Sequence, residues 1–424
     1  MISARVILWG TEIGAVYQES ISSVPKFSYS SGFLKSGIQI APLTMPLSGQ
    51  IYSFPSLNQD TFLGLPGPLA DSLPDKYGTA VLTKYLEDQG RPADSISAVE
   101  RLCYIGQRGM GALEYEPEIG IGQDDGTVDI AGLVNLASDI LAQRRELHVN
   151  SMQQMITVGT SAGGARAKAI IAWNRENGDI RSGQIDAGKG YEYWIIKFDG
   201  VENNKDHDED SDGTEYTRIE YAYHNMAKAA GVRMSECLLF EENGRHHFMT
   251  KRFDRDENGR KLHMLSLGGM AHMDYKMPGA HSYEEVSNII YQLGLPASDA
   301  EQLFCRMAFN DLARNYDDHV KNTAFLMNRQ GIWSLAPAYD ITYEYDKSSM
   351  WVARHQMSIN GKLEGIQVSD LLEAGKRMNL SVNKCQKIID SVTKAVKDWP
   401  KFAEEAGVSE KSMEEIRDNI RIDP

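Results

Sequence analysis

The most constraining feature of this sequence is the polar run Asn315-Tyr316-Asp317-Asp318-His319-Val320-Lys321-Asn322, which follows an apolar segment. Within the run, four residues separate the acid Asp317 from Asn322. Residues 323–335 are predicted to form a β-hairpin with its turn at 328–331, since strand-like stretches flank Asn-Arg-Gln-Gly. A second acid, Asp340, follows the hairpin. A hairpin fixes its two ends relative to each other, so we expect these polar side chains to share one site.

Protein kinases show the same order of residues. Their catalytic loop contains an acid and, after four intervening residues, an Asn, and a β-hairpin then leads to a metal-binding Asp. In that arrangement Asp317 accepts or orients the proton of an attacking hydroxyl group. The four-residue spacing to Asn322 favours Asp317 over Asp318. Asn322 and Asp340 offer the hard oxygen atoms that magnesium prefers. Lys321 and His319 are then predicted to contact the transferred phosphate.

A glycine-rich stretch, Gly159-Thr160-Ser161-Ala162-Gly163-Gly164-Ala165-Arg166-Ala167-Lys168, precedes this region by about half the chain. Small residues let backbone N–H groups approach phosphate oxygens, which suits a nucleotide loop. The stretch is not a Walker A motif, because Ala165-Arg166 stand where Lys-Ser/Thr belong. Taken alone, the stretch favours a flexible hairpin turn over a nucleotide loop.

The segments after the glycine-rich stretch follow the order of a kinase N-lobe. Lys197 lies in the apolar strand predicted at 193–198, and a phosphate-binding lysine occupies such a strand in kinases. Glu220 lies near the start of a helix predicted at 215–230, where it would pair with Lys197. The strand at 247–253 leads into the predicted hinge between the lobes, whose backbone would meet adenine. A lysine on the solvent face of an edge strand is the alternative for Lys197.

We predict three regions, 1–110, 111–255 and 256–424, of which the first is rich in strands and the last is mainly helical. Helices are expected at 77–87, 93–105, 129–149, 215–230, 282–293, 297–313, 369–374, 381–397, 400–406 and 409–421. Asp71 and Asp75 precede the first of these helices. Turn or helix-capping roles are favoured for them, and a functional role is the alternative.

Composition excludes several classes of function. The net charge of -15 is unfavourable for direct nucleic-acid binding, because phosphate contacts dominate that affinity. No apolar run approaches the roughly 20 residues of a membrane span, and no signal peptide is recognisable. The four dispersed cysteines predict reduced thiols and a cytoplasmic protein. The acidic run 203–212 begins like a calcium loop, but Ile219 stands where a bidentate Glu is needed, so a solvated loop is favoured.

Taken together, these motifs resemble those of the HipA-like serine/threonine kinases, the toxins of bacterial HipBA toxin–antitoxin modules. The resemblance spans nearly the whole chain. Its most specific elements are Arg252-Phe253-Asp254-Arg255 and Asp317-Asp318-His319-Val320-Lys321-Asn322. The N-terminal module adds Phe62-Leu63-Gly64-Leu65 leading to Ala70-Asp71-Ser72-Leu73-Pro74-Asp75. It implies an α+β, bilobal protein-kinase-like fold of the PI3/4-kinase-like HipA subtype, with an N-terminal β-rich subdomain and a helical C-terminal lobe.

The resemblance also implies a nucleotide site, with ATP and Mg2+ as cofactors. Asp317 would be catalytic, Asn322 and Asp340 would bind the metal, and Ser161 matches the autophosphorylated serine, whose modification would shut off ATP binding. With Glu220 from the spacing argument, the ATP-binding set is Gly163, Gly164, Ala165, Arg166, Ala167, Lys168, Lys197, Glu220, Lys251, Arg252, Phe253, His319, Val320, Lys321, Asn322, Tyr339 and Asp340. For Lys251, whose side chain varies, only the backbone is expected to take part.

The partners implied by the resemblance are a HipB-like helix-turn-helix antitoxin and a protein substrate, an aminoacyl-tRNA synthetase, whose phosphorylation halts translation and favours persistence. Operator DNA would be reached mainly through the antitoxin, and no membrane is involved. Two alternatives differ in class. One is an antitoxin-bound transcriptional co-repressor with little catalytic role, and the other is a small-molecule or lipid kinase on the same fold.

Overall fold

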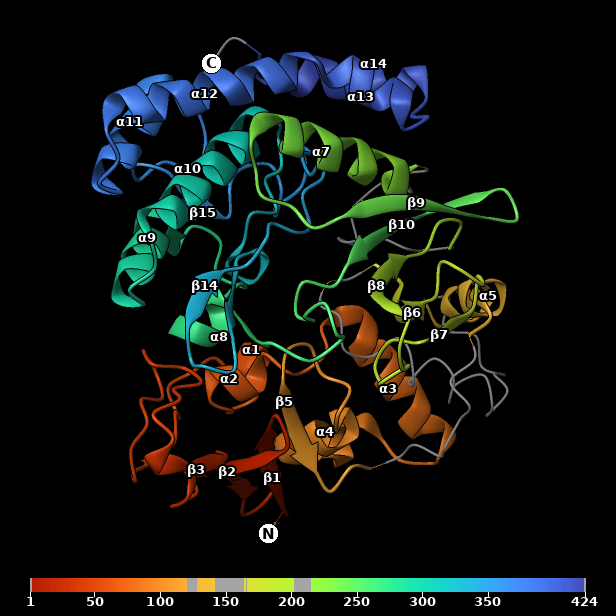
Figure 1. The fold of residues 1–424 in the computed structure, drawn as a ribbon, viewed down its shortest axis with the longest axis vertical. Helices are drawn as coiled ribbons and strands as arrows, with labels where there is room; N and C mark the ends of the chain where they lie inside the picture. Colours follow the sequence, from red (N-terminus) through yellow and green to blue (C-terminus); the bar gives the residue numbers. More distant parts are fainter. Residues whose placement is uncertain (1, 120–127, 142–163, 165, 202–214, 423–424) are drawn as a thin grey trace.

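The computed structural model describes residues 2–119, 128–141, 164, 166–201 and 215–422. Three regions follow one another along the long axis of the molecule (Figure 1). An N-terminal sheet lies at one end, the C-terminal helices lie at the other, and a second sheet lies between them on one side. The α+β, bilobal architecture expected from the sequence is confirmed. The N-terminal region, which contains the first sheet and is called the N-terminal module below, is present in addition to the two lobes.

The first sheet is antiparallel, with the order β4-β3-β2-β1-β5. Its strands are β1 (Ile2–Leu8), β2 (Thr11–Gln18), β3 (Lys26–Tyr29), β4 (Ile51–Tyr52) and β5 (Leu113–Glu116). Trp9 and Gly10, both with positive φ, make the two-residue turn between β1 and β2. Because Tyr115 of β5 lies opposite Val6 of β1, the N-terminal sheet extends past the boundary expected at residue 110.

Four helices accompany this sheet: α1 (Gln59–Phe62), α2 (Gly67–Ala70), α3 (Lys76–Asp88) and α4 (Ala98–Ile105). The helix predicted at 77–87 is confirmed by α3. The helix predicted at 93–105 is wrong in its first part, where residues 93–95 form only a 3-10 turn. Ser97 is extended and its side chain accepts a hydrogen bond from the Glu100 backbone N–H, so the capped helix begins after it.

The second sheet has the antiparallel order β7-β6-β8-β10-β9. Its strands are β6 (Lys168–Trp173), β7 (Ile180–Ser182), β8 (Glu192–Lys197), β9 (Cys237–Glu242) and β10 (Arg245–Lys251). The helices α5 (Ile130–Leu141) and α7 (Tyr216–Ala230) belong to the same stretch of chain. Gly231, at φ 98°, ends α7 as a left-handed cap. Residues 142–149 of one predicted helix and the acidic run 203–212 lie outside the described residues.

The C-terminal region is mainly helical, as expected. It contains α8 (Leu267–Ala271), α9 (Tyr283–Gln292), α10 (Ala297–Leu312), α11 (Val368–Arg377), α12 (Val382–Lys397), α13 (Trp399–Glu405) and α14 (Glu410–Asn419). The predicted hairpin is confirmed by β13 (Ala324–Met327) and β14 (Trp333–Leu335). Two further features are not predicted from the sequence. One is β11 (His263–Ser266), which pairs with β13, and the other is the short parallel pair β12 (His281–Ser282) and β15 (Met357–Ser358).

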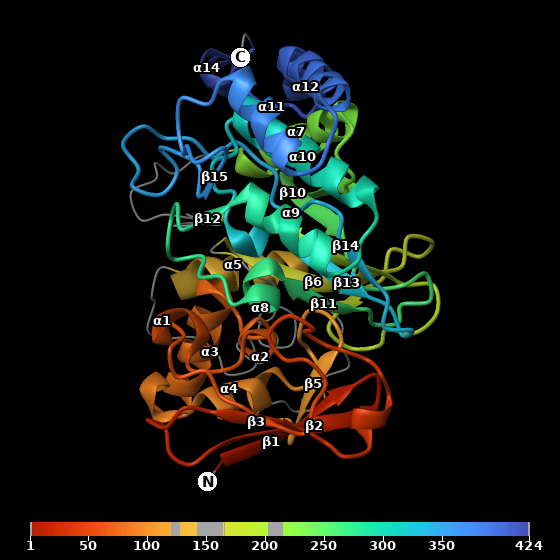
Figure 2. The ribbon, with the colours of Figure 1, turned by 90° about the vertical axis from the view of Figure 1, so that its left-hand side faces the viewer.

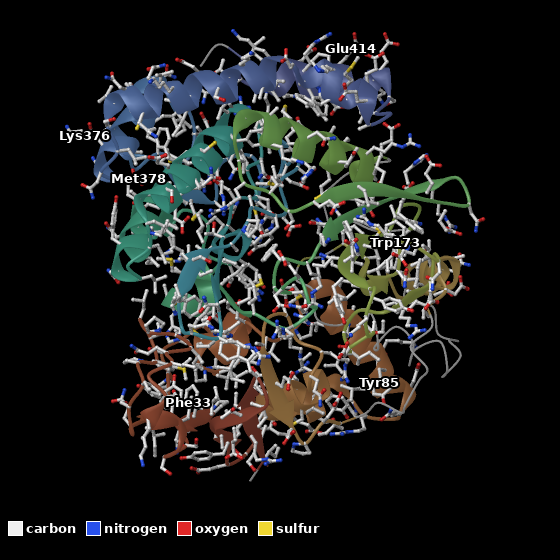
Figure 3. All side chains as sticks on the ribbon, viewed as in Figure 1. Phe33, Tyr85, Trp173, Lys376, Met378 and Glu414 are labelled. Atoms are coloured by element: carbon white, nitrogen blue, oxygen red, sulfur yellow. The ribbon has the colours of Figure 1, made fainter. Side chains whose placement is uncertain are left out.

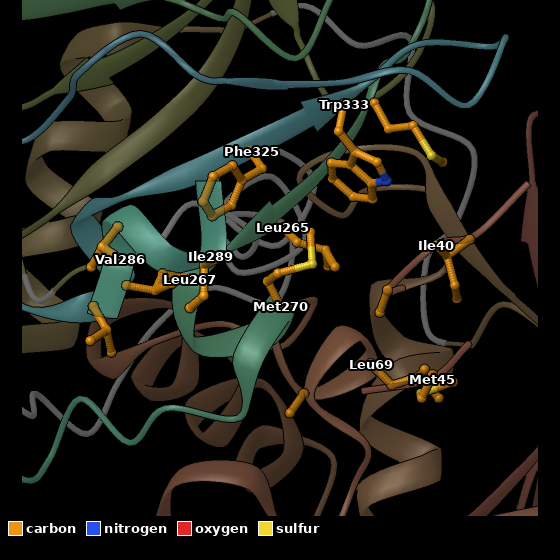
Figure 4. Close-up of a cluster of buried hydrophobic side chains, with 14 of the residues drawn as sticks. Ile40, Met45, Leu69, Leu265, Leu267, Met270, Val286, Ile289, Phe325 and Trp333 are labelled. Atoms are coloured by element: carbon orange, nitrogen blue, oxygen red, sulfur yellow. The ribbon is translucent and has the colours of Figure 1, made fainter. Parts of the chain in front are cut away.

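Hydrophobic packing joins the three regions rather than separating them. Ile40 and Leu69 of the N-terminal module share one core with Leu265 of β11 and Met270 of α8 (Figure 4). A second core packs α3 and α5 against the second sheet, in the part of the molecule where Figure 3 labels Tyr85 and Trp173. The nucleotide lobe predicted at 111–255 therefore rests partly on a helix of the N-terminal module.

The third core places α7 among the C-terminal helices, beside α10 and α12 (Figure 2). Tyr223 of α7 packs 5.2 Å from Trp399 of α13, measured between ring centroids. This packing fixes the position of α7, and with it the positions of its side chains relative to both lobes. Within the part of the chain that the structure describes, no helix has the length and apolar character that crossing a bilayer requires.

Close packing between the C-terminal helices predicts an effect at Gly375 of α11. A methyl group there would lie 2.4 Å from the Cys385 Sγ and 2.8 Å from a ring carbon of Phe304, both buried. Overpacking costs about 1–3 kcal/mol, and the helix preference of alanine offsets roughly 1 kcal/mol of it. We expect Gly375→Ala to lower the free energy of unfolding in a urea titration by about 1 kcal/mol, and by no more than about 2 kcal/mol.

Gly32→Ala is the matched control for this substitution. Gly32 has φ -67° and open space around the added methyl group, so stability should change by less than about 0.5 kcal/mol. Equal effects of the two substitutions would contradict the packing of α11 against α10 and α12.

Candidate active site

The predicted site residues that the structure describes gather around one cavity of about 1680 Å³. It lies where the second sheet, the catalytic hairpin and the N-terminal module meet. The predicted residues that line it are Gly164, Arg166, Lys168, Lys197, Glu220, Lys251, Arg252, Phe253, Asp317, His319, Lys321, Asn322, Tyr339 and Asp340.

Four residues of the predicted set are not part of this lining as far as it is described. The side chains of Ala167 and Val320 are buried in the hydrophobic cores. Gly163 and Ala165, together with the predicted autophosphorylation site Ser161, lie outside the described residues. Only backbone atoms of Ala167 and Val320 remain candidates for contact with a nucleotide.

Lys197 occupies the centre of the site, at the end of β8. Its Nζ lies 2.6 Å from the Glu220 Oε1 and 2.5 Å from the Asp340 Oδ1. Burial opposes the charged form of Lys197, but the two carboxylates outweigh burial and raise its pKa above the ordinary value. Burial also opposes ionisation of Asp340, but Lys197 and then Lys168 lower the pKa of Asp340 to about 2. The predicted lysine–glutamate pair is present, and it includes a third charged group.

The loop from Asp317 to Asn322 is closed by its own polar groups. The Asn322 Nδ2 donates a hydrogen bond to the Asp317 carbonyl at 2.8 Å, which accounts for the four-residue spacing between them. The Tyr339 hydroxyl donates to the Lys321 carbonyl, and the Tyr339 ring lies 5.5 Å from that of Phe253. These contacts hold the loop against both the hinge and the segment that carries Asp340.

The two neighbouring acids of the loop have different surroundings. Asp318 is buried, and its carboxylate accepts hydrogen bonds from the Tyr283 hydroxyl, the His355 Nδ1 and the Gln356 backbone N–H, each at 2.7 Å. Asp317 lines the cavity, and its side chain is 25% exposed. Asp318 is therefore an internal support of the loop, whereas Asp317 is accessible to a substrate hydroxyl.

His355, which the sequence analysis did not single out, stabilises that support. It is fully buried between Asp318 and Asp311, with its Nε2 3.4 Å from the Asp311 Oδ1. Burial lowers the pKa of His355, but Asp318 and Asp311 outweigh burial and raise that pKa to about 9. A buried charged imidazole thus connects α10 to the catalytic loop. A lone histidine in a loop gives no sequence signal for such a role.

The side chains of the hinge residues Lys251 and Arg252 contribute less to the site than the positions of these residues in the motif suggest. The Arg252 guanidinium is bound to the buried Asp254, at 2.6 and 2.8 Å, and to the Gly183 carbonyl at 3.2 Å. The Lys251 Nζ lies 2.6 Å from Glu192. Both side chains are therefore engaged away from any phosphate, and their backbone is the part that can meet a nucleotide base.

The main residue that the sequence analysis missed is Asp75. Its Oδ2 accepts a hydrogen bond from the Gly164 backbone N–H at 2.9 Å, and its Oδ1 pairs with the Lys321 Nζ. Asp75 stands at the N-cap position of α3, but its side chain makes no capping bond, so the predicted capping role is wrong. Asp71, four residues earlier, binds the backbone N–H and hydroxyl of Ser266 at 2.6 Å. The Asp-Ser-Leu-Pro-Asp sequence carries no local signal of these distant partners.

The donor set at the cavity fits a magnesium ion held together with a polyphosphate. Among the described residues, no group of three or more His, Cys, Asp and Glu side chains forms a metal site by itself. Asn322 and Asp340 nevertheless both line the cavity and provide one amide and one carboxylate oxygen. Magnesium often takes only one or two protein ligands and completes its shell with water and phosphate oxygens. These two residues would hold it.

Two family models together match most of this chain. Residues 4–116 match the HipA N-terminal domain, and residues 160–419 match the HipA-like C-terminal domain. The chain belongs to the HipA family. A search of curated proteins found no significant match.

Two similar solved structures bear on the fold. The first is HipA of Shewanella oneidensis MR-1, solved with HipB and its operator DNA, at 15% identity and a TM-score of 0.67. That match covers 98% of this chain and 95% of the other. The second is the Helicobacter pylori proinflammatory kinase CtkA, at 14% identity and a TM-score of 0.31, covering 53% of this chain and 92% of that one. The first supports the fold over the whole chain, and the second is too distant to add to it.

The raised pKa of His355 predicts a pH-dependent stability. A group whose pKa is higher in the folded state stabilises the fold fully below its unfolded pKa of about 6.5, and this contribution is lost as the pH rises through about 9. We expect the free energy of unfolding in urea to fall between pH 6.5 and 9.5 by on the order of 3 kcal/mol more in the native protein than in His355→Gln. Parallel pH profiles of the two proteins would show that His355 is neutral in the fold.

Proposed function

We propose that this HipA-family protein is an ATP- and magnesium-dependent protein serine/threonine kinase. One observation carries the proposal: Lys197, with its partners Glu220 and Asp340, faces the same cavity as Asp317 and Asn322. Lysines at this cavity neutralise phosphate charge, and an accessible carboxylate beside them suits a hydroxyl nucleophile.

The reaction follows from these positions. The oxygen of a substrate hydroxyl attacks the γ-phosphorus of ATP, its proton passes to the Asp317 carboxylate, and the bond to the β,γ-bridging oxygen breaks to release ADP. Lys197 and Lys321 bind phosphate oxygens, and the hinge backbone receives the base. Magnesium held at Asn322 and Asp340 would supply further charge neutralisation. Asp318 and His355 keep the loop in position.

The biological role proposed for this chemistry is that of a toxin. The phosphorylated protein would be an aminoacyl-tRNA synthetase, so that translation stops and growth arrest and persistence follow. A HipB-like antitoxin is the expected partner, since the related Shewanella HipA was solved with HipB and operator DNA. Phosphorylation of Ser161, in the glycine-rich stretch, would add a doubly charged group and prevent ATP binding.

The catalytic assignment predicts the effect of Asp317→Asn. The amide keeps the size of the side chain but cannot accept the proton, so transfer of labelled γ-phosphate to a proteome extract should fall by about 10²-fold or more. Growth arrest on expression should be lost with it. Asp390→Asn, on the exposed face of α12, is the control and should retain full transfer. Transfer that survives in Asp317→Asn would refute the role of Asp317. Growth arrest that survives without transfer would favour a co-repressor.

Two lysines near the cavity provide a sharper comparison. Lys197 is buried among carboxylates of the site, whereas the ammonium group of Lys251 binds Glu192 away from it. Lys197→Met should weaken ATP binding and lower kcat/KM by about 10²-fold, and Lys251→Met should change either quantity by less than about threefold. Isothermal titration with Mg-ATP and steady-state kinetics measure both. Equal losses would show that the Lys251 side chain also holds the nucleotide.

A further inference from the structure

Asp75 belongs to the N-terminal module, yet its carboxylate takes two donors of the candidate nucleotide site. The Gly164 backbone N–H donates to its Oδ2 at 2.9 Å, and the Lys321 Nζ pairs with its Oδ1. The first donor comes from the glycine-rich stretch, and the second comes from the catalytic loop. One carboxylate therefore bridges the two segments that a kinase uses on opposite sides of the phosphates.

Both donors are of the kind that binds phosphate: a glycine N–H four residues before β6 and a lysine ammonium group. A third cation is close, because a methyl group at Gly164 would lie 2.6 Å from the Lys168 Nζ. An anion at this point is well placed electrostatically. A carboxylate with two acceptor oxygens satisfies the same donors as two phosphate oxygens.

We propose that Asp75 is an internal competitor for the phosphate groups of the nucleotide and thereby sets the affinity of the site. The proposal rests on the function proposed above. A nucleotide must release Lys321 and Gly164 from Asp75 before its own phosphates can use them. The apparent dissociation constant then equals the intrinsic one divided by the fraction of molecules in which the two donors are released.

The surroundings of Asp75 hold it in this competing position. Burial raises its pKa, but the charge and the hydrogen bond of Lys321 outweigh burial and lower that pKa, so the group stays anionic at neutral pH. The module that carries Asp75 shares a hydrophobic core with β11 and α8 of the C-terminal lobe. Asp71 cannot take the same role, because its oxygens accept hydrogen bonds from Ser266.

The test compares nucleotide binding by the full-length protein and Asp75→Asn. Asparagine keeps the shape and the acceptor for Gly164 but removes the charge that attracts Lys321. If the Asp75-bound form makes up about nine-tenths of the molecules, the dissociation constant for Mg-ATP falls about tenfold in isothermal titration. Asp60→Asn is the matched control. Asp60 lies in the same module at the same cavity, and this substitution should leave the constant unchanged.

A weaker or unchanged affinity of Asp75→Asn for Mg-ATP, in a protein whose native form binds it, would overturn competition and leave the kinase proposal standing. If neither protein binds Mg-ATP, the kinase proposal fails. In that case the binding of inorganic pyrophosphate is measured instead. Binding about tenfold tighter to Asp75→Asn than to the native protein supports competition between Asp75 and an anion, and equal binding or no binding overturns it. Asp75→Ser replaces Asp75→Asn if the latter does not unfold cooperatively.

Discussion

The ionic cluster of Lys197, Glu220 and Asp340 is the interaction on which the site depends. These residues come from β8, from α7 and from the segment after the catalytic hairpin, so both lobes contribute to the cluster. Removing one member of a buried ion pair leaves an uncompensated charge, which costs roughly 3–5 kcal/mol. The cluster therefore fixes the distance between Lys197 of the second sheet and Asp340, which follows the β13–β14 hairpin.

Placement of α7 makes this constraint effective. Tyr223 on one face of the helix packs against Trp399 and Phe309 of the C-terminal helices, while Glu220 reaches Lys197 in the second sheet. A shift of α7 by one helical turn would move Glu220 by about 5.4 Å and separate it from Lys197. The tightly packed aromatic core around Tyr223, three residues along α7 from Glu220, is thus a direct determinant of the charge arrangement in the cavity.

The parts of this structure that could be predicted from the sequence have local signals. The helix at α7 was predicted from its apolar spacing and its glycine cap, and the hairpin β13–β14 from its turn residues. Lys197 and Glu220 were paired because each lies at a recognisable place in its own element. By contrast, β5 and β11 are short strands defined by partners far along the chain, and β5 was assigned to the wrong side of a domain boundary for that reason.

The same limit applies to single residues of the site. Asp318 and Asp317 are adjacent and identical in type, and only the spacing to Asn322 distinguished them in the sequence. Their difference in burial depends on Tyr283 and His355, which are 35 and 37 residues away from Asp318 in the chain. Asp75 lies 246 residues from Lys321, so no local pattern could join them.

Charge balance explains why these long-range contacts exist. Lys197 is buried and the side chain of Lys321 is only 20% exposed, and a buried ammonium group without a partner is strongly unfavourable. A site built to hold phosphates must therefore compensate its lysines with carboxylates while it is empty. At Lys197 the compensating groups belong to the site itself, since Asp340 also suits a metal ion. At Lys321 the compensating group comes from a separate module. The affinity for a nucleotide then depends on how much more strongly Lys321 binds the nucleotide phosphate than the competing carboxylate. The N-terminal module contributes that carboxylate.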